Sequence, residues 1–306
     1  MSELNYQDGT VLENRDHAIF IEANFKTDDL DAIKDAIGDF SARLRSYKTR
    51  FGHMGLSAVL AFGRDAWTKL SGDAESAEEL HDLQTMAKGM VQGTQRDMFV
   101  HILSYEHKMN FTLAQDFVSC FKDLITIEEE VHGFRWLEAR DLSGFVDGTE
   151  NPKGLQDRVD VAIIPEGKDA GGSYVIAQRW VHDIDKFNTF DLAKQEGTFG
   201  RTKHDDIEMA DEDKPMGAHT ERVVIEKDGE ELEIVRQSLP YGYASSEKGL
   251  YFVGYCAKLS SIDAMLKNMC GENDEHFDLM FGYTKAVTGS YLYVPSMDQL
   301  DDLSAE

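Results

Sequence analysis

The sequence has few basic residues, no long apolar run and no paired cysteines, and each absence narrows the classes of protein it can encode. Lys and Arg number 31 against 57 Asp and Glu, which gives a formal net charge of −26. Such an acidic surface repels phosphate backbones and anionic lipid headgroups, and no Lys- or Arg-rich run offsets the repulsion. We therefore expect neither a nucleic-acid partner nor a membrane partner.

Signals for secretion or membrane insertion are also missing. No apolar stretch approaches the roughly 20 residues that span a bilayer. Residues 1–5 show neither the basic nor the apolar part of a signal peptide, and no twin-arginine motif. The three cysteines, Cys120, Cys256 and Cys270, have no Cys-x-x-Cys spacing and indicate no disulfide framework. We expect buried free thiols in a protein of the reducing cytoplasm.

The sequence does contain enough apolar material for a sizeable core, with 42% hydrophobic residues in 306. That length suits two domains of ordinary size. The segment Leu142–Gly154 is dense in Gly, Asp, Asn and Pro, which mark a linker or a functional loop. We therefore expect an N-terminal domain over residues 1–142 and a C-terminal domain over residues 143–306.

Strand and helix patterns alternate along both halves. Alternating β-branched and aromatic residues predict a strand at His17–Phe25, and Met98–Ser104 resembles a buried strand. Further extended segments are expected at Leu56–Phe62, Glu128–Arg140, Ser173–His182, Glu231–Ser238 and Gly249–Ala257. Helical spacing predicts helices after Thr27, along Phe111, Ala114, Val118, Phe121 and Ile125, and over Phe187–Glu196 and Ser260–Met269. Two strand-then-helix stretches of the first half are echoed in the second. The fold class we predict is α+β with mostly antiparallel sheets.

Asp147 lies in the most unusual segment, Gly144–Pro152. Flanking glycines allow backbone conformations closed to other residues and a close approach to a ligand. A carboxyl between Phe145 and Val146 can lose solvent, which raises its pKa toward a role in acid–base chemistry. The alternative is an Asp-Gly turn stabilised by Asx hydrogen bonding, and the pattern alone favours that alternative.

His219 and Arg236 are two further candidates that spacing cannot decide. No His or Cys stands at zinc-like spacing from His219, so a four-ligand zinc site is not indicated. A single axial ligand to haem needs no such cluster, because the porphyrin supplies four nitrogens. Arg236 follows Ile234 and Val235 on an expected strand, where it is either salt-bridged at the surface or a fixed cation for an anionic or oxygen ligand.

Taken together, these segments resemble the dye-decolorizing peroxidase family. Gly144–Gly148 matches its Gly-x-x-Asp-Gly signature, and Thr149–Pro152 extends the match. The segment Tyr283–Ser296 is similar to the C-terminal segment of that family. The resemblance spans the whole chain and is strongest to the compact bacterial subgroup of YfeX-like proteins.

The resemblance implies tandem ferredoxin-like domains with antiparallel sheets, as in dimeric α+β barrels, and haem b bound without a covalent link in the second domain. His219 matches the axial ligand of the iron. Asp278 matches the carboxylate that accepts the other imidazole N–H and makes the ring a stronger donor.

The resemblance also implies a reaction. Asp147 matches the distal aspartate, which relays a proton between the oxygens of hydrogen peroxide, and Arg236 matches the arginine that stabilises charge as the O–O bond breaks. The products are water and a ferryl porphyrin radical, which phenolic or dye-like donors, small aromatic reductants among them, return to the resting state.

Four other residues are candidates for the haem pocket. Arg201 is a cation suited to a haem propionate. Leu250 and Phe252 match an apolar cover, although ordinary core packing explains them nearly as well. Ser238 stands where several relatives have Asn, and its hydroxyl can still bind a distal water.

Two other functions remain open at this stage. A haem carrier or haem-iron handling protein of the deferrochelatase kind needs His219 and the pocket, whereas Asp147 and Arg236 together favour catalysis. A haem-free dimeric α+β protein would keep the motifs as structural relics. We expect a homo-oligomer, a dimer or higher. The acidic end over residues 298–306 lacks a hydrophobic tail, so we do not expect encapsulin cargo.

Overall fold

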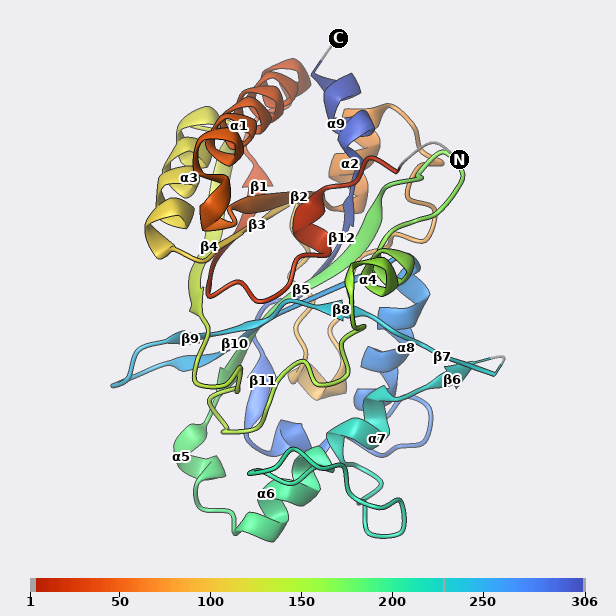
Figure 1. Ribbon diagram of the computed structural model, residues 1–306. Coiled ribbons are helices and arrows are strands. Elements are labelled where there is room, and N and C mark those ends of the chain that lie inside the picture. The colour runs from red at the N-terminus through yellow and green to blue at the C-terminus, as the bar shows by residue number, and fades with distance from the viewer. Residues whose placement is uncertain (1–3, 228, 305–306) are drawn as a thin grey trace.

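The computed structural model describes residues 4–227 and 229–304 (Figure 1). In the N-terminal half the chain runs through β1 (His17–Phe25), α1 (Leu30–Phe51), β2 (Ser57–Phe62), α2 (Arg64–Ser71), β3 (Met98–Ser104), α3 (His107–Cys120) and β4 (Ile125–Phe134). With α2 as an insertion, this is the βαββαβ order of a ferredoxin-like unit. The strands lie in the order β2-β3-β1-β4, and every pairing among them is antiparallel.

The second half repeats this order with more insertions. The elements are α4 (Leu155–Ala162), β5 (Ser173–His182), α5 (Ile184–Phe187), α6 (Leu192–Phe199), α7 (His219–Val223), β6 (Glu226–Lys227), β7 (Glu230–Glu231), β8 (Val235–Arg236), β9 (Leu239–Gly242), β10 (Lys248–Cys256), α8 (Leu259–Met269), β11 (Thr284–Ala286), β12 (Ser290–Val294) and α9 (Met297–Leu303). Here β5 lies between β10 on one side and β11 and β12 on the other. The predicted α+β class with antiparallel sheets is confirmed.

The two sheets join edge to edge into a closed ring of strands. Tyr293 of β12 pairs with Phe62 of β2, and Gly133 of β4 pairs with Tyr241 of β9. Because side chains alternate along a strand, each strand of the ring presents one face inward and one outward. On β10, Tyr251 points inward and stacks on Phe20 of β1, with ring centroids 4.2 Å apart. The inside of the ring is therefore a packed core.

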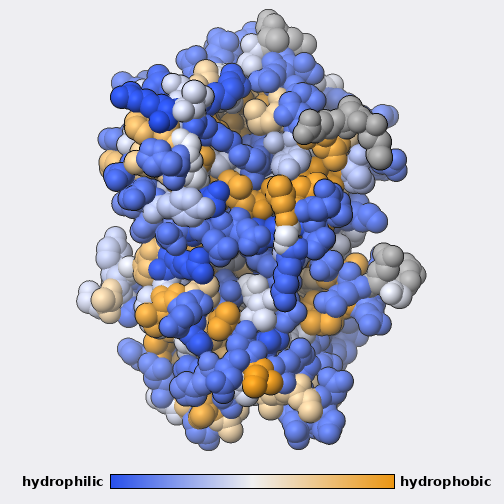
Figure 2. Space-filling view, viewed as in Figure 1, coloured by the Kyte–Doolittle hydropathy of each residue, from blue (hydrophilic) through white to orange (hydrophobic). Residues whose placement is uncertain are grey.

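Helices cover the outer faces of the ring (Figure 1). α1 and α3 lie side by side on the N-terminal sheet, where Phe40 meets Phe117 edge to face at 5.5 Å. α8 packs on β5 and β10 of the other sheet. Within the described part of the chain no helix is long and apolar enough to cross a membrane. The face seen in Figure 2 is mostly hydrophilic, with apolar side chains in scattered groups.

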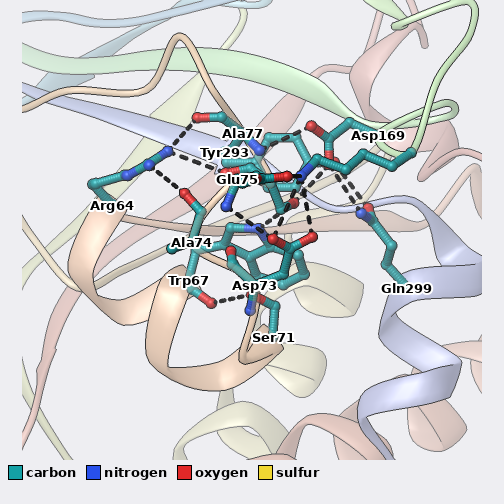
Figure 3. A network of polar contacts seen from close by, with 12 residues as sticks. Arg64, Trp67, Ser71, Asp73, Ala74, Glu75, Ala77, Asp169, Tyr293 and Gln299 are labelled. Carbon is teal, nitrogen blue, oxygen red and sulfur yellow. Dashed lines mark hydrogen bonds and ion pairs between the residues drawn. The ribbon is translucent and has the colours of Figure 1, made fainter.

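A partly buried polar network joins the two halves beside α2 (Figure 3). The carboxylate of Asp169 accepts hydrogen bonds from the Ser76 hydroxyl at 2.6 Å and the Ala77 N–H at 2.8 Å. Tyr293 and Gln299, from β12 and α9, donate to the same carboxylate at 3.4 and 3.3 Å. Asp169 thus links three segments that lie far apart in the sequence.

Several predicted segments were wrong in their bounds. Strand β4 ends at Phe134 rather than continuing to Arg140, since Leu137 and Ala139 adopt positive φ angles of 38° and 60°. The helix expected over residues 187–196 is two short helices, because Asp183 and Asp191 each cap a new helical start. The strand expected over residues 231–238 is reduced to β8, since β7 pairs with β6 as a separate hairpin.

The apolar face predicted for α3 was only partly correct: Ala114 and Phe121 are buried as expected. Phe111 and Val118 are 45% and 42% exposed. The buried face also includes Met109, Leu113 and Phe117, and Phe117 contacts Phe40 of α1. The helix ends at Cys120, before Ile125.

Candidate functional site

Two cavities meet at a shared wall formed by the loop after β4 and by β8. Asp147 and Arg236 line both of them, together with Gly148 and Thr149. One, the apolar cavity, is bounded mainly by hydrophobic side chains of β5, β10 and α8: Ile176, Trp180, Leu250, Phe252, Ile262, Met265, Leu266 and Met269. The other, the cationic cavity, lies on the far side of the wall, where the two halves of the chain face each other.

The loop that carries Asp147 is fixed by its backbone. Gly144 and Gly148 have φ angles of +90° and +85°, a region that other residues rarely enter. The Asp147 N–H donates to the Ala139 carbonyl at 2.9 Å. Burial raises the pKa of the Asp147 carboxyl above its ordinary value; the Arg236 charge opposes this shift and the Asp141 charge adds to it. The residue is therefore suited to exchange a proton.

Arg236 is held by a side chain that acts as a strand partner. The Arg236 N–H donates to Oδ1 of Asn151 at 2.8 Å, and Nδ2 of Asn151 donates to the Arg236 carbonyl at 2.8 Å. On its other side Arg236 pairs with Gly254 of β10. The N–H and the carbonyl of Arg236 are both hydrogen-bonded, so its guanidinium is held at the wall between the cavities. Its Nε is buried and meets no hydrogen-bond acceptor among the described residues.

His219 begins α7 and lines the apolar cavity. Its Nδ1 lies 2.7 Å from Oδ2 of Asp278, whose side chain is completely buried. Oδ1 of Asp278 accepts the Met280 N–H at 2.8 Å and so caps the short 3-10 helix Leu279–Gly282. The carboxylate thus fixes the imidazole from one side, and Nε2 remains for a ligand in the cavity.

The four other candidates for the haem pocket lie in different surroundings. Leu250 and Phe252 both line the apolar cavity. Arg201 also lines it, but its guanidinium already bonds Asp206 and Glu150, each at 2.8 Å. Ser238 lies in the cationic cavity, and its hydroxyl accepts the Val253 N–H at 3.3 Å.

Sequence reasoning missed a buried pair at the end of the apolar cavity. Nε2 of His182 lies 3.0 Å from Oδ1 of Asp141, and Nδ1 lies 2.6 Å from the Thr284 hydroxyl. Although burial opposes ionisation, the neighbouring His182 lowers the pKa of Asp141 to about 2. The Asp141 charge reaches Asp147 and raises its pKa. No spacing signal predicts this pair, because it joins residues from separate elements.

Asn151 was missed in a different way. It belongs to the Gly144–Pro152 segment, but the resemblance to the family assigns it no role. A cue existed in its residue type, since a primary amide offers one donor and one acceptor group and can satisfy a free strand edge.

Comparisons with known proteins agree on one family. Residues 7–135 match the family model described as Dyp-type peroxidase, N-terminal, and residues 138–299 match the one described as Dyp-type peroxidase, C-terminal. The chain is 38% identical over 291 residues to the dye-decolorizing peroxidase of Rhodococcus erythropolis (strain PR4 / NBRC 100887). That match covers 93% of this chain and 85% of the relative.

Solved structures give the same answer. The encapsulated DyP-type peroxidase from Mycobacterium smegmatis, a cryo-EM structure, superimposes with a TM-score of 0.92 at 34% identity over 98% of both chains. A variant of DypB from Rhodococcus jostii RHA1 in complex with heme superimposes with a TM-score of 0.88 at 30% identity over 99% of both chains.

Proposed function

The chain belongs to the Dyp-type peroxidase family and is a peroxidase, and from that premise we propose that it binds haem b without a covalent link in the apolar cavity. We further propose that it reduces hydrogen peroxide to water while oxidising phenolic or dye-like donors. The observation that carries the proposal is convergence. His219, Asp147 and Arg236 come from three separate segments and line one cavity.

The residues present fit a haem. A porphyrin is a flat apolar ring, and the walls from β5, β10 and α8 are apolar. Iron needs an axial donor, and Nε2 of His219 is available because Asp278 holds Nδ1. The orphaned Nε of Arg236 fits a polar ligand near the iron.

When bound, haem would supply the iron at which the peroxide O–O bond is cleaved. The chain supplies the groups around that reaction. Asp147, with its raised pKa, would take a proton from one peroxide oxygen and return it to the leaving oxygen. Arg236 would stabilise the negative charge that develops there. Asp278 would keep the His219 ring oriented and electron-rich.

Arg201 is the residue that we propose for a haem propionate, and it would have to exchange partners to act as one. Its charge is now satisfied by Asp206 and Glu150, with Glu208 at 3.6 Å. Glu150 is half-exposed at the cavity rim, and an exposed ion pair contributes little stability. Exchanging its carboxylate for a propionate would therefore cost little free energy.

The direct test is an absorption spectrum of the haem-reconstituted protein before and after one equivalent of peroxide. We expect a Soret band that shifts on adding peroxide and returns when a phenolic donor is added. Haem binding without a peroxide response would favour the haem-handling alternative, and the absence of a Soret band would overturn the proposal.

The localisation, the oligomeric state and the relation to encapsulin shells are proposals as well. We propose a cytoplasmic homo-oligomer that is not encapsulin cargo. The Mycobacterium smegmatis relative is described as encapsulated, so the cargo prediction has a clear test. Co-expression with an encapsulin shell should leave this chain in the shell-free fraction.

A further inference from the structure

The cationic cavity has a charge opposite to that of the whole protein. Its lining carries six cationic side chains, Arg15, Arg135, Arg140, Lys153, Arg158 and Arg236, against two carboxylates, Glu13 and Asp147. The chain as a whole has a net charge of −26. Because like charges repel, six cations facing one cavity cost free energy, and that cost is offset when an anion binds.

Backbone carbonyls hold the guanidinium groups of two arginines of this cavity, Arg15 and Arg140. Arg15 donates to the Gly55 carbonyl at 2.9 Å and to the Glu13 carbonyl at 2.7 Å. Arg140 donates to the carbonyls of Gly144 and Lys203 at 2.8 and 2.7 Å. A carbonyl fixes a guanidinium in place and leaves its charge uncompensated.

Two arginines outside the cavity are held by carboxylates instead. Arg179 pairs with Glu129 and Glu247, and Arg222 pairs with Asp274. Within the cavity, carboxylates reach only part of the charge. The almost fully exposed Glu138 lies 3.2 Å from Arg140. Glu13 lies 3.4 Å from Arg158.

One of the six cations, Arg158, has lost most of its contact with solvent. Arg158 is only 5% exposed, and this burial lowers the pKa of its guanidinium. Its N–H groups donate to the carbonyls of Pro152 and Val11 at 3.1 and 2.9 Å. Lys153 is exposed at the rim and forms no ion pair with any residue that the structure describes. The cavity therefore combines a fixed cation in its wall with a free one at its mouth.

The same cavity has an apolar side. Leu12, Leu103, Trp136, Leu239 and Pro240 share its lining with the cations. Hydrogen peroxide is small and neutral, and it would gain little from either feature. A ligand with an anionic head and a flat apolar body would use both, because guanidinium groups bind carboxylates by charge-assisted hydrogen bonds and aromatic faces stack on rings.

We propose that the cationic cavity is a binding site for small aromatic carboxylates, separate from the apolar cavity and reaching Asp147 and Arg236 from the opposite side. The carboxylate would be attracted by Lys153 and Arg135 at the rim and held within the field of Arg15 and Arg158. The ring would lie against Trp136. This inference goes beyond the proposed peroxidase function, and it does not require bound haem.

The test compares benzoate with benzamide, a neutral molecule of nearly the same shape. Isothermal titration of the full chain without added haem should show saturable binding of one benzoate. Benzamide should bind at least about tenfold more weakly, which is the loss of one charge-assisted hydrogen bond. Added salt should weaken benzoate binding and leave benzamide unaffected. Equal affinities for the two ligands, or no binding of benzoate, would overturn the proposal.

Variants locate the site. Lys153→Gln should weaken benzoate binding by about fivefold, the size of an exposed ion pair, and Lys153→Glu should weaken it further. Lys168→Gln is the matched control, because Lys168 is an exposed lysine in the loop before β5 that pairs with Asp73. A control variant that weakens binding as much as Lys153→Gln would contradict the site.

Haem loading separates the two cavities. Haem would fill the apolar cavity, so benzoate should still bind to the haem-loaded protein and its affinity should change by less than the Lys153→Glu effect. Loss of benzoate binding on loading would place the ligand in the apolar cavity and overturn the inference. Failure to load haem would instead count against the proposed function.

Discussion

The two cavities differ in almost every property except the wall that they share. The apolar cavity offers hydrophobic faces of strands and a helix, with His219 entering from α7. The cationic cavity offers fixed guanidinium groups at the junction of the two halves. Asp147 and Arg236 belong to both, so each experiences a desolvating surface on one side and a positive field on the other. A proton acceptor at such a boundary can be tuned from both directions.

The largest effect is expected from a substitution that affects the apolar cavity alone. His219→Ala should lower haem affinity by more than about 100-fold. Loss of a residue that only hydrogen-bonds a metal ligand already lowers metal affinity by up to about 100-fold, and the loss of the ligand itself should cost more. Spectroscopic titration with haem measures it. His53→Ala, at an exposed position in the 3-10 turn that follows α1, is the control. Benzoate binding should survive in His219→Ala, and its loss there would contradict the separation of the two cavities.

The next largest effect is expected from a substitution in the wall that the two cavities share. Arg236→Ala should slow the reaction with peroxide by about 10²–10³-fold, the usual loss for one donor that stabilises developing charge. Haem should remain bound, as shown by an intact Soret band, and stopped-flow absorbance measures the rate. Arg43→Ala removes an exposed arginine paired with Asp116 and should leave the rate unchanged. A rate close to that of the parent protein would remove Arg236 from the chemistry.

A smaller effect comes from the side chain that holds Arg236. Asn151→Ala removes two hydrogen bonds and should lower the free energy of unfolding by about 1–3 kcal/mol. The peroxide rate should also fall, by less than in Arg236→Ala, while haem affinity is kept. Urea denaturation and stopped-flow absorbance provide the two readouts. Asn188→Ala, at the end of α5, serves as a control for the loss of an amide.

The smallest effect concerns pH. A carboxyl whose folded pKa lies above its unfolded value destabilises the fold when ionised, and the penalty disappears as the pH falls below both values. Because burial raises the pKa of Asp147 from 3.8, Asp147→Asn should raise the urea midpoint at pH 7. The gain should shrink as the pH approaches about 4. An increase that persists unchanged at acid pH would show that ionisation of Asp147 is not its cause.

The sequence could predict the strands and the reactive loop because both are local. Runs of β-branched and aromatic residues mark β1, β3 and β5, whose observed bounds equal the predicted ones. The glycines around Asp147 predict a backbone conformation that other residues rarely adopt, and Gly144 and Gly148 do have positive φ angles. The resemblance to the family supplied the roles of His219 and Asp278, and the geometry now places the two side chains in contact.

Other features could not be read from the sequence because they arise from long-range contacts. The cationic cavity gathers arginines from residues 15 to 236, and the sequence shows them only as scattered charges in an acidic chain. The pair of Asp141 and His182 joins a loop to a strand 41 positions away. The α3 face was only partly predicted for the same reason, since Phe117 packs against Phe40 of α1.

The amide of Asn151 has a consequence beyond catalysis. A strand edge with free N–H and C=O groups can recruit a strand from another molecule, and short edges are usually protected by charge or proline. β8 is only two residues long, and a single side chain occupies its outer hydrogen-bonding positions at Arg236. The chain thereby closes an aggregation-prone border with one residue, and the arginine keeps its whole side chain free to face the cavities.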